Sequence, residues 1–139
     1  MKVTDQVPGW TEEASVKVKL FDLQHQHLFK LIDRLETAMS EGRGKQQMEE
    51  FLSDVAEYAW EHFATEEAVM KAYDFPWREK HAQEHRQAEA TVAKFRDQAA
   101  SGDPALSVHV LHSLKEWVSQ HVQGTDKMYT EFLNARGMC

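Results

Sequence analysis

The sequence predicts an all-α fold: an antiparallel, up-down-up-down four-helix bundle with an extended N-terminal arm. Three observations support this fold class. Four long segments repeat apolar residues every three or four positions, which is the spacing of one face of an α-helix. Short breaks containing glycine, proline or aspartate separate these segments. Because the connections are short, each helix is expected to run antiparallel to the one before it.

Length and composition indicate one domain without a membrane-spanning segment. With 139 residues we expect a single domain over 1–139, with the arm at 1–18 and the bundle at 19–135. The 23 acidic and 16 basic residues give a net charge of −7, and no basic patch indicates a nucleic-acid partner. No apolar run resembles a signal peptide or a transmembrane helix, so we expect a cytoplasmic protein without a membrane partner. A domain of a larger receptor would have the same composition.

The N-terminal half of the sequence predicts the arm and two helices. Residues 1–18 contain Trp10 but no sustained helical spacing, so we expect an arm that lies over the bundle. The first helix is expected at 19–41 and the second at 45–72, with a glycine-containing break between them. The predicted inward faces are His25, Leu28, Ile32, Leu35 and Met39 in the first helix, and Met48, Leu52, Val55, Ala59, His62, Glu66 and Val69 in the second.

The C-terminal half predicts two further helices, at 77–100 and 105–135. Between them, Gly102 is suited to end one helix, and Asp103 followed by Pro104 is suited to begin the next. The predicted inward faces are His81, His85, Ala88, Val92, Phe95 and Ala99 in the third helix, and Leu106, Val110, Leu114, Trp117 and His121 in the fourth.

Seven polar residues fall where the four helices are expected to point inward: His25, His62, Glu66, His81, His85, His121 and Asp126. Protein cores seldom contain so much imidazole and carboxylate unless something neutralises it. His62 and Glu66 are four residues apart, as are His81 and His85, so each pair lies on one helix face. A metal is therefore the simplest compensating partner.

The composition of this set indicates two transition-metal ions. Five imidazoles and two carboxylates exceed the four ligands usual for one zinc ion, whereas calcium or magnesium would need mostly oxygen ligands. Each carboxylate can instead bridge two ions. The lack of a thiolate or methionine at ligand spacing disfavours copper, and the large share of imidazole disfavours manganese, so the residues favour iron. Folding is expected to depend on the metal, because an apo core would contain unpaired polar groups.

Each of these residues also has a purely structural interpretation. A lone buried histidine is more often structural than a ligand, and His62 with Glu66 could be an ordinary pair one turn apart. Seven such residues at one depth of the bundle disfavour that interpretation. Glu67 is expected to be solvated or to support a ligand, and Asp22 to cap the first helix or to orient a ligand histidine. The remaining histidines have no partner at ligand spacing and are expected to have surface or structural roles: His27, His109 and His112.

One spacing does not fit a regular helix. His121 and Asp126 are five residues apart, which corresponds to about 500° of rotation and places them roughly 140° away from a common face. A π-type widening or a break near Gly124 would turn both side chains inward. We therefore predict an irregular helix over residues 119–128.

The motifs that carry these residues resemble those of the bacteriohemerythrins, the single-domain microbial branch of the hemerythrin family. The matching segments are Asp22-Leu-Gln-His25 followed by Leu28-Phe29, His62-Phe63-x-x-Glu66-Glu67, His81-x-x-x-His85, and Trp117-x-x-x-His121-x-x-x-x-Asp126-Lys127-x-Tyr129. They occur in the family's order across nearly the whole chain, and all seven ligand positions are filled. The resemblance implies two iron ions, Fe2+ or Fe3+, with a bridging oxo or hydroxo group. It assigns His81, His85 and His121 to one iron, His25 and His62 to the other, and Glu66 and Asp126 to bridges between them.

The resemblance further implies reversible dioxygen binding for storage, delivery or scavenging, at an open position on the iron with two histidines. The residues expected around that position are apolar: Leu28, Phe63, Trp117, Val118 and Val122. These residues also have the simpler interpretation of core packing. A pocket wall without a proton-donating group favours reversible binding over cleavage of dioxygen, so we expect a non-enzyme. Nitric oxide and azide-like small anions are further candidate ligands. The alternatives are an oxygen or redox sensor domain of a larger signalling protein, and a di-iron peroxidase or nitric-oxide reductase.

Overall fold

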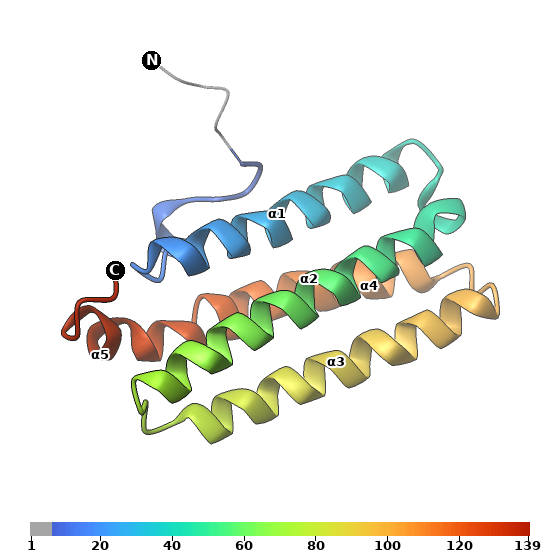
Figure 1. The fold of residues 1–139 in the computed structure, drawn as a ribbon. Coiled ribbons are helices and arrows are strands. Elements are labelled where there is room, and N and C mark those ends of the chain that lie inside the picture. The colour runs from blue at the N-terminus through green and yellow to red at the C-terminus, as the bar shows by residue number, and fades with distance from the viewer. Residues whose placement is uncertain (1–6) are drawn as a thin grey trace, which may run out of the picture.

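The computed structural model describes residues 7–139, and its long helices lie side by side (Figure 1). These helices are α1 (Lys19–Ser40), α2 (Gly44–Ala72), α3 (Arg78–Ala100) and α4 (Leu106–Trp117). After α4 come a π-helical turn (Val118–Val122), a 3-10 turn (Thr125–Tyr129) and the short helix α5 (Thr130–Asn134). The predicted all-α, four-helix architecture is confirmed. Within residues 7–139, no helix is both long enough and apolar enough to cross a membrane.

Consecutive long helices reverse direction, so one end of the bundle gathers the start of α1, the end of α2, the start of α3 and α5 (Figure 1). The break after α3 uses Gly102 at a φ of 79°, in the left-handed region that favours glycine at a helix end. Asp103 then accepts a hydrogen bond from the backbone N–H of Ala105 (2.9 Å), just before α4 begins. The predicted break is therefore present, but Asp103 and Pro104 lie in the turn before α4, whose N-cap is Ala105, and not at the positions expected for them.

The described part of the arm, residues 7–18, packs against the bundle, while residues 1–6 of the predicted arm lie outside the described residues. Trp10 meets Phe29 of α1 edge to face, with ring centroids 5.4 Å apart. The arm is not wholly extended, because Glu12–Ala14 form a 3-10 turn. Its last residues, Val16 and Val18, are fully buried.

Asp22 fastens the arm to the first turn of α1. Its carboxylate accepts hydrogen bonds from the Ser15 hydroxyl (2.6 Å) and from the backbone N–H of Val16 (2.8 Å). The residue that precedes α1, Val18, has no side-chain cap. The expectation that Asp22 caps this helix or orients a ligand histidine is therefore wrong.

Two apolar clusters enclose the seven polar residues along the bundle. Along α1, for example, Phe21 belongs to the smaller cluster, His25 to the polar layer and Leu28 to the larger cluster. The smaller cluster consists of Val16, Val18, Phe21, Met70, Phe75, Tyr129 and Leu133. Because apolar side chains cover the polar layer on both sides, its electrostatic interactions are only weakly screened by water.

The fourth predicted helix is interrupted where the sequence suggested. Residues Val118–Val122 form a π-helical turn, in which the N–H of Gln123 donates to the carbonyl of Val118 (2.9 Å). A turn at Gly124 and the 3-10 turn follow, and they bring Asp126 to the same buried layer as His121. The predicted irregularity is confirmed, whereas one continuous helix over 105–135 is wrong.

Gly124 is expected to be indispensable to this turn. A Cβ atom at this position would overlap the carbonyl oxygen of Gln120, which belongs to the backbone and cannot move aside cheaply. We expect Gly124→Ala to lower the free energy of unfolding by about 1–3 kcal/mol, measured by chemical denaturation. Ser119→Ala, at an exposed position in the same segment, is the control and is expected to be nearly neutral. Equal stability of the two variants would contradict this account.

Candidate metal centre

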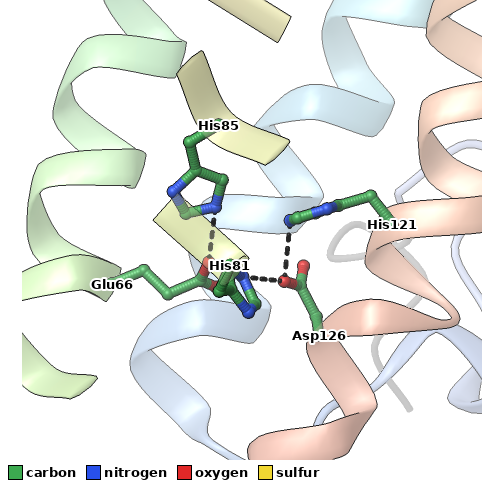
Figure 2. A group of neighbouring side chains, drawn as sticks. All are labelled: Glu66, His81, His85, His121 and Asp126. Atoms are coloured by element: carbon green, nitrogen blue, oxygen red, sulfur yellow. Dashed lines mark hydrogen bonds and ion pairs between the residues drawn. The ribbon is translucent and has the colours of Figure 1, made fainter. Parts of the chain in front are cut away.

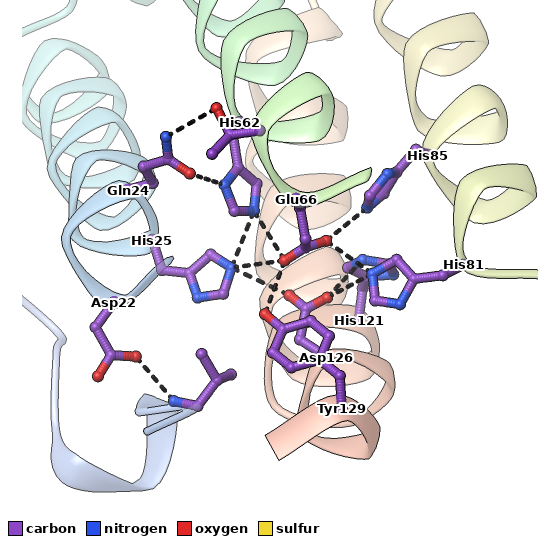
Figure 3. A network of polar contacts seen from close by, with 12 residues as sticks. Asp22, Gln24, His25, His62, Glu66, His81, His85, His121, Asp126 and Tyr129 are labelled. Atoms are coloured by element: carbon purple, nitrogen blue, oxygen red, sulfur yellow. Dashed lines mark hydrogen bonds and ion pairs between the residues drawn. The ribbon is translucent and has the colours of Figure 1, made fainter. Parts of the chain in front are cut away.

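The seven predicted polar residues converge in one buried layer, although they come from three long helices, the π-helical turn and the 3-10 turn (Figure 3). None of them is more than 2% exposed. Their ligand atoms form two groups, each within 4.8 Å: Glu66, His81, His85, His121 and Asp126 in one, and His25, His62, Glu66 and Asp126 in the other. Both carboxylates belong to both groups. This arrangement is consistent with a site for two metal ions.

Three of the imidazoles are oriented by oxygen atoms behind them. The pairs and their Nδ1–oxygen distances are His62 with Gln24 (2.6 Å), His85 with Glu67 (2.7 Å) and His121 with Glu84 (2.8 Å). Amide and carboxylate oxygens only accept, so Nδ1 carries the proton and donates it to them. In a neutral imidazole, Nε2 is then left with a lone pair directed into the layer.

The inward-facing atoms are placed so that a cation is needed between them. Nε2 of His85 lies 3.0 Å from Oε1 of Glu66, and His121 faces Asp126 in the same way (Figure 2). Two acceptor atoms at this distance repel each other unless a proton or a metal ion lies between them. Both carboxylate oxygens of Asp126, and Nε2 of His85 and of His121, also lack a hydrogen-bond partner within residues 7–139. The donor set therefore fits metal ions.

The charges in this layer stabilise one another even when only protons compensate them. Burial opposes a charged imidazole, but hydrogen bonds to Asp126 and Glu66 outweigh it and raise the pKa of His81 to about 10. The pKa of His25 is also raised in spite of burial, mainly by Asp126. Burial would raise the pKa of Glu66 and of Asp126, yet the surrounding histidines lower both. The layer thus favours two carboxylates together with positive charge.

Aromatic side chains fix the planes of the ligand rings. The stacked pairs are Phe63 on His85 (3.9 Å between ring centroids, 3° between planes), Trp117 on His121 (3.9 Å, 13°) and Tyr58 on His62 (5.6 Å, 12°). Tyr129 fixes a carboxylate instead, because its hydroxyl donates to Oε2 of Glu66 (2.8 Å). Neighbouring side chains therefore hold His62, His85, His121 and Glu66 in position.

A cavity of about 570 Å³ lies between α2, α3 and α4 and reaches the polar layer at His121. Three of the five residues expected around a ligand, Leu28, Phe63 and Trp117, line it. The other two do not: Val118 lines a second hollow beside the arm, and Val122 is buried in the larger apolar cluster.

The cavity also changes the environment predicted for α3. Only His81 and His85 of this helix are fully buried. The remainder of its expected inward face is half-buried, because Ala88, Val92 and Phe95 line the cavity and do not pack tightly against α4. These residues still pack against the larger apolar cluster, so the predicted inward face of α3 is confirmed, although beyond the two histidines it is only half-buried.

A further correction concerns the cavity wall, which was expected to carry no proton-donating group. Tyr58 lies one turn before His62 on α2 and lines the same cavity. Burial, reinforced by the negative charges of Asp126 and Glu66, raises the pKa of Tyr58 well above its usual range, so its hydroxyl keeps the proton. The four-residue spacing from His62 is the sequence signal that points to this tyrosine.

Two further residues of the site were not predicted. Gln24 directly precedes His25 but supports His62, and Glu84 directly precedes His85 but supports His121. Each support therefore crosses from one helix to another, so spacing within a single helix does not reveal it.

The three histidines expected outside the site are exposed: His27, His109 and His112. Glu67 was expected either to be solvated or to support a ligand, and it supports His85.

Comparison with known families identifies this constellation. The hemerythrin HHE cation binding domain matches residues 16–133. The chain belongs to the hemerythrin family. The resemblance found in the sequence motifs is confirmed, and the hemerythrin match includes all seven residues of the buried layer.

Similar proteins extend the match to most of the chain. A bacteriohemerythrin of Ralstonia nicotianae is 43% identical over 76 residues, which cover 55% of this chain and 56% of that protein. A bacteriohemerythrin of Stenotrophomonas maltophilia is 24% identical over 91% of this chain and 81% of its own length, and a myohemerythrin of Riftia pachyptila is 27% identical over 86% and 88%. The crystal structure of a hemerythrin mutant, 22% identical, superimposes with a TM-score of 0.79 over 88% of this chain and 93% of that one, which shows a hemerythrin fold.

Proposed function

We propose that this protein binds dioxygen reversibly at a non-haem di-iron centre, for storage, delivery or scavenging. In this proposal His81, His85 and His121 hold one iron, His25 and His62 hold the other, and the two acids shared by both groups hold both. An oxo or hydroxo group would complete the bridge. The observation that carries the proposal is the unequal division of five histidines around two shared carboxylates. One ion would have three histidines and the two shared acids as ligands. The other would have two histidines and the same acids, and so one protein ligand fewer.

The chain's own residues supply what reversible binding needs. When bound, iron would supply the electrons and the open coordination position that dioxygen binding needs. Leu28, Phe63 and Trp117 form an apolar part of the cavity wall, which suits a small neutral molecule, while polar residues such as Glu84 and Thr125 line other parts of the cavity. Buried acids with lowered pKa values remain charged and available as ligands. Oxygen binding is also the typical role of the hemerythrin family, which supports a carrier over an enzyme.

Metal content and optical spectra of the purified protein test this function. We expect two iron ions per chain and charge-transfer bands in the oxidised protein. The reduced protein should gain an absorption band in air that disappears when oxygen is removed, over several cycles. Protein loaded with zinc is the control, because zinc does not change its oxidation state. Slow oxidation in air without any reversible band would contradict reversible binding.

A further inference from the structure

Tyr58 has a buried hydroxyl group that the fold does not use. The residue is 6% exposed, and its ring stacks almost parallel on the imidazole of His62. The hydroxyl oxygen has no hydrogen-bond partner among residues 7–139. Tyr129 provides a comparison at the same site, because its buried hydroxyl donates to Glu66 at 2.8 Å. Of these two tyrosines in the site, Tyr129 has a protein partner for its hydroxyl and Tyr58 has none.

An unpartnered phenol in this position is unfavourable for stability. Burying a hydroxyl group without a hydrogen bond costs free energy, whereas phenylalanine would fill the same space and keep the ring on His62. Buried polar groups in native proteins nearly always have a partner, so an exception calls for a ligand or a functional role. The sequence nevertheless has tyrosine here, which indicates that the hydroxyl has a partner other than the described residues 7–139.

The position of Tyr58 indicates where that partner binds. Tyr58 lines the cavity beside the apolar side chains of Leu28 and Phe63. Polar side chains such as Glu84 and Thr125 also line this cavity, but none of them is a hydrogen-bond partner of the Tyr58 hydroxyl. The ring on which it stacks, His62, belongs to the two-histidine group. Under the proposed function, this is the half of the centre with the open position. A phenol O–H is therefore available beside the place where a small ligand would bind.

We propose that the Tyr58 hydroxyl donates a hydrogen bond to the small ligand bound at the two-histidine half of the centre, and so favours ligands with a strong acceptor atom. This inference rests on the proposed function, because it requires a ligand at that half. It gives Tyr58 a positioning and specificity role. The hydrogen bond would increase the affinity for an anion, but not for a ligand that has no acceptor atom.

Azide binding to the oxidised, iron-loaded full chain tests the proposal, with Tyr58→Phe as the variant. We expect the dissociation constant for azide, from optical titration, to rise about tenfold, because a hydrogen bond to an anion is lost. Tyr73→Phe makes the same chemical change at the end of α2, and it is expected to leave the constant unchanged. The infrared band of bound azide should shift between H2O and D2O in the wild type and in Tyr73→Phe, but not in Tyr58→Phe.

A stability measurement separates this role from a structural one. Without metal or azide, Tyr58→Phe should be at least as stable to denaturant as the wild type, because the hydroxyl has no hydrogen-bond partner among residues 7–139 to lose. A less stable variant would show a structural partner and overturn the proposal. Equal azide affinity and equal isotope shift in Tyr58→Phe and wild type would overturn it too, while leaving the proposed function intact. If the iron-loaded wild type does not bind azide, the open position itself is refuted, and both proposals fail.

Discussion

Replacing Glu66 with glutamine is expected to reduce bound metal from two ions per chain to one or none. Glu66 contributes an atom to both ligand groups, and it is fully buried among His62, His81 and His85. Glutamine keeps the size of the side chain but removes the charge that both ions would share. Loss of a residue that merely supports a ligand costs about 10- to 100-fold in metal affinity, so loss of a shared ligand should cost more.

Metal analysis after dialysis against a weak chelator measures this effect. Glu61→Gln is the matched control, because Glu61 is on the same helix and exposed. The control is expected to retain the metal content of the wild type. Two ions bound to Glu66→Gln with unchanged affinity would show that Glu66 is not a shared ligand.

The second large effect is expected in the pH dependence of the metal-free protein. Folding raises the pKa of His81 from 6.5 to about 10, so the protonated form stabilises the folded state. This stabilisation is complete below pH 6.5 and is lost as the pH rises through 10, at a cost of roughly 5 kcal/mol. The lowered pKa values of Glu66 and Asp126 act in the opposite sense, because their contribution is present above about pH 4 and is lost as the pH falls.

Chemical denaturation of the metal-free protein at several pH values measures this dependence. The free energy of unfolding should be highest between about pH 5 and 6.5 and should fall toward pH 10. Metal binding requires deprotonated imidazoles, so the extra stability gained from metal should increase over the same interval. A metal-free protein whose stability does not fall between pH 7 and 10 would contradict the proton-linked pairing of His81 with the two acids.

The sequence predicted the helices and the polar layer because both depend on local periodicity. Apolar spacing placed the boundaries of α1, α2 and α3 within about one residue. Six of the seven polar residues continue the apolar faces predicted for the four helices. Asp126 did not fit a regular helix, and that misfit itself predicted the irregular turn. The helical rotation per residue therefore predicts which residues face inward. It also predicts that the helix must be irregular between His121 and Asp126.

The parts of the site that could not be predicted depend on contacts between helices. Gln24 and Glu84 each support a histidine on another helix, and their pairing depends on how far neighbouring helices are rotated and displaced. The half-buried face of α3 has the same origin, since its composition is apolar while its separation from α4 is a property of the packed bundle. The periodicity of a single helix does not show how neighbouring helices are rotated, displaced or separated.

The polar layer also determines how the chain resists opening. Cys139 is the only cysteine among the 139 residues, so no disulfide can form between them. One bound ion would instead tie α1 and α2 to the 3-10 turn after α4, and the other would tie α2 and α3 to the two turns after α4. Such coordinate cross-links shorten the loops that can open and so reduce the entropy gained on unfolding. All of them would lie at one end of the bundle. The opposite end, with the turns between α1 and α2 and between α3 and α4, is held by apolar packing and by exposed ion pairs such as Arg34–Asp54 and Arg43–Glu41. Exposed ion pairs contribute little, so local opening should begin there while the end with the polar layer stays closed.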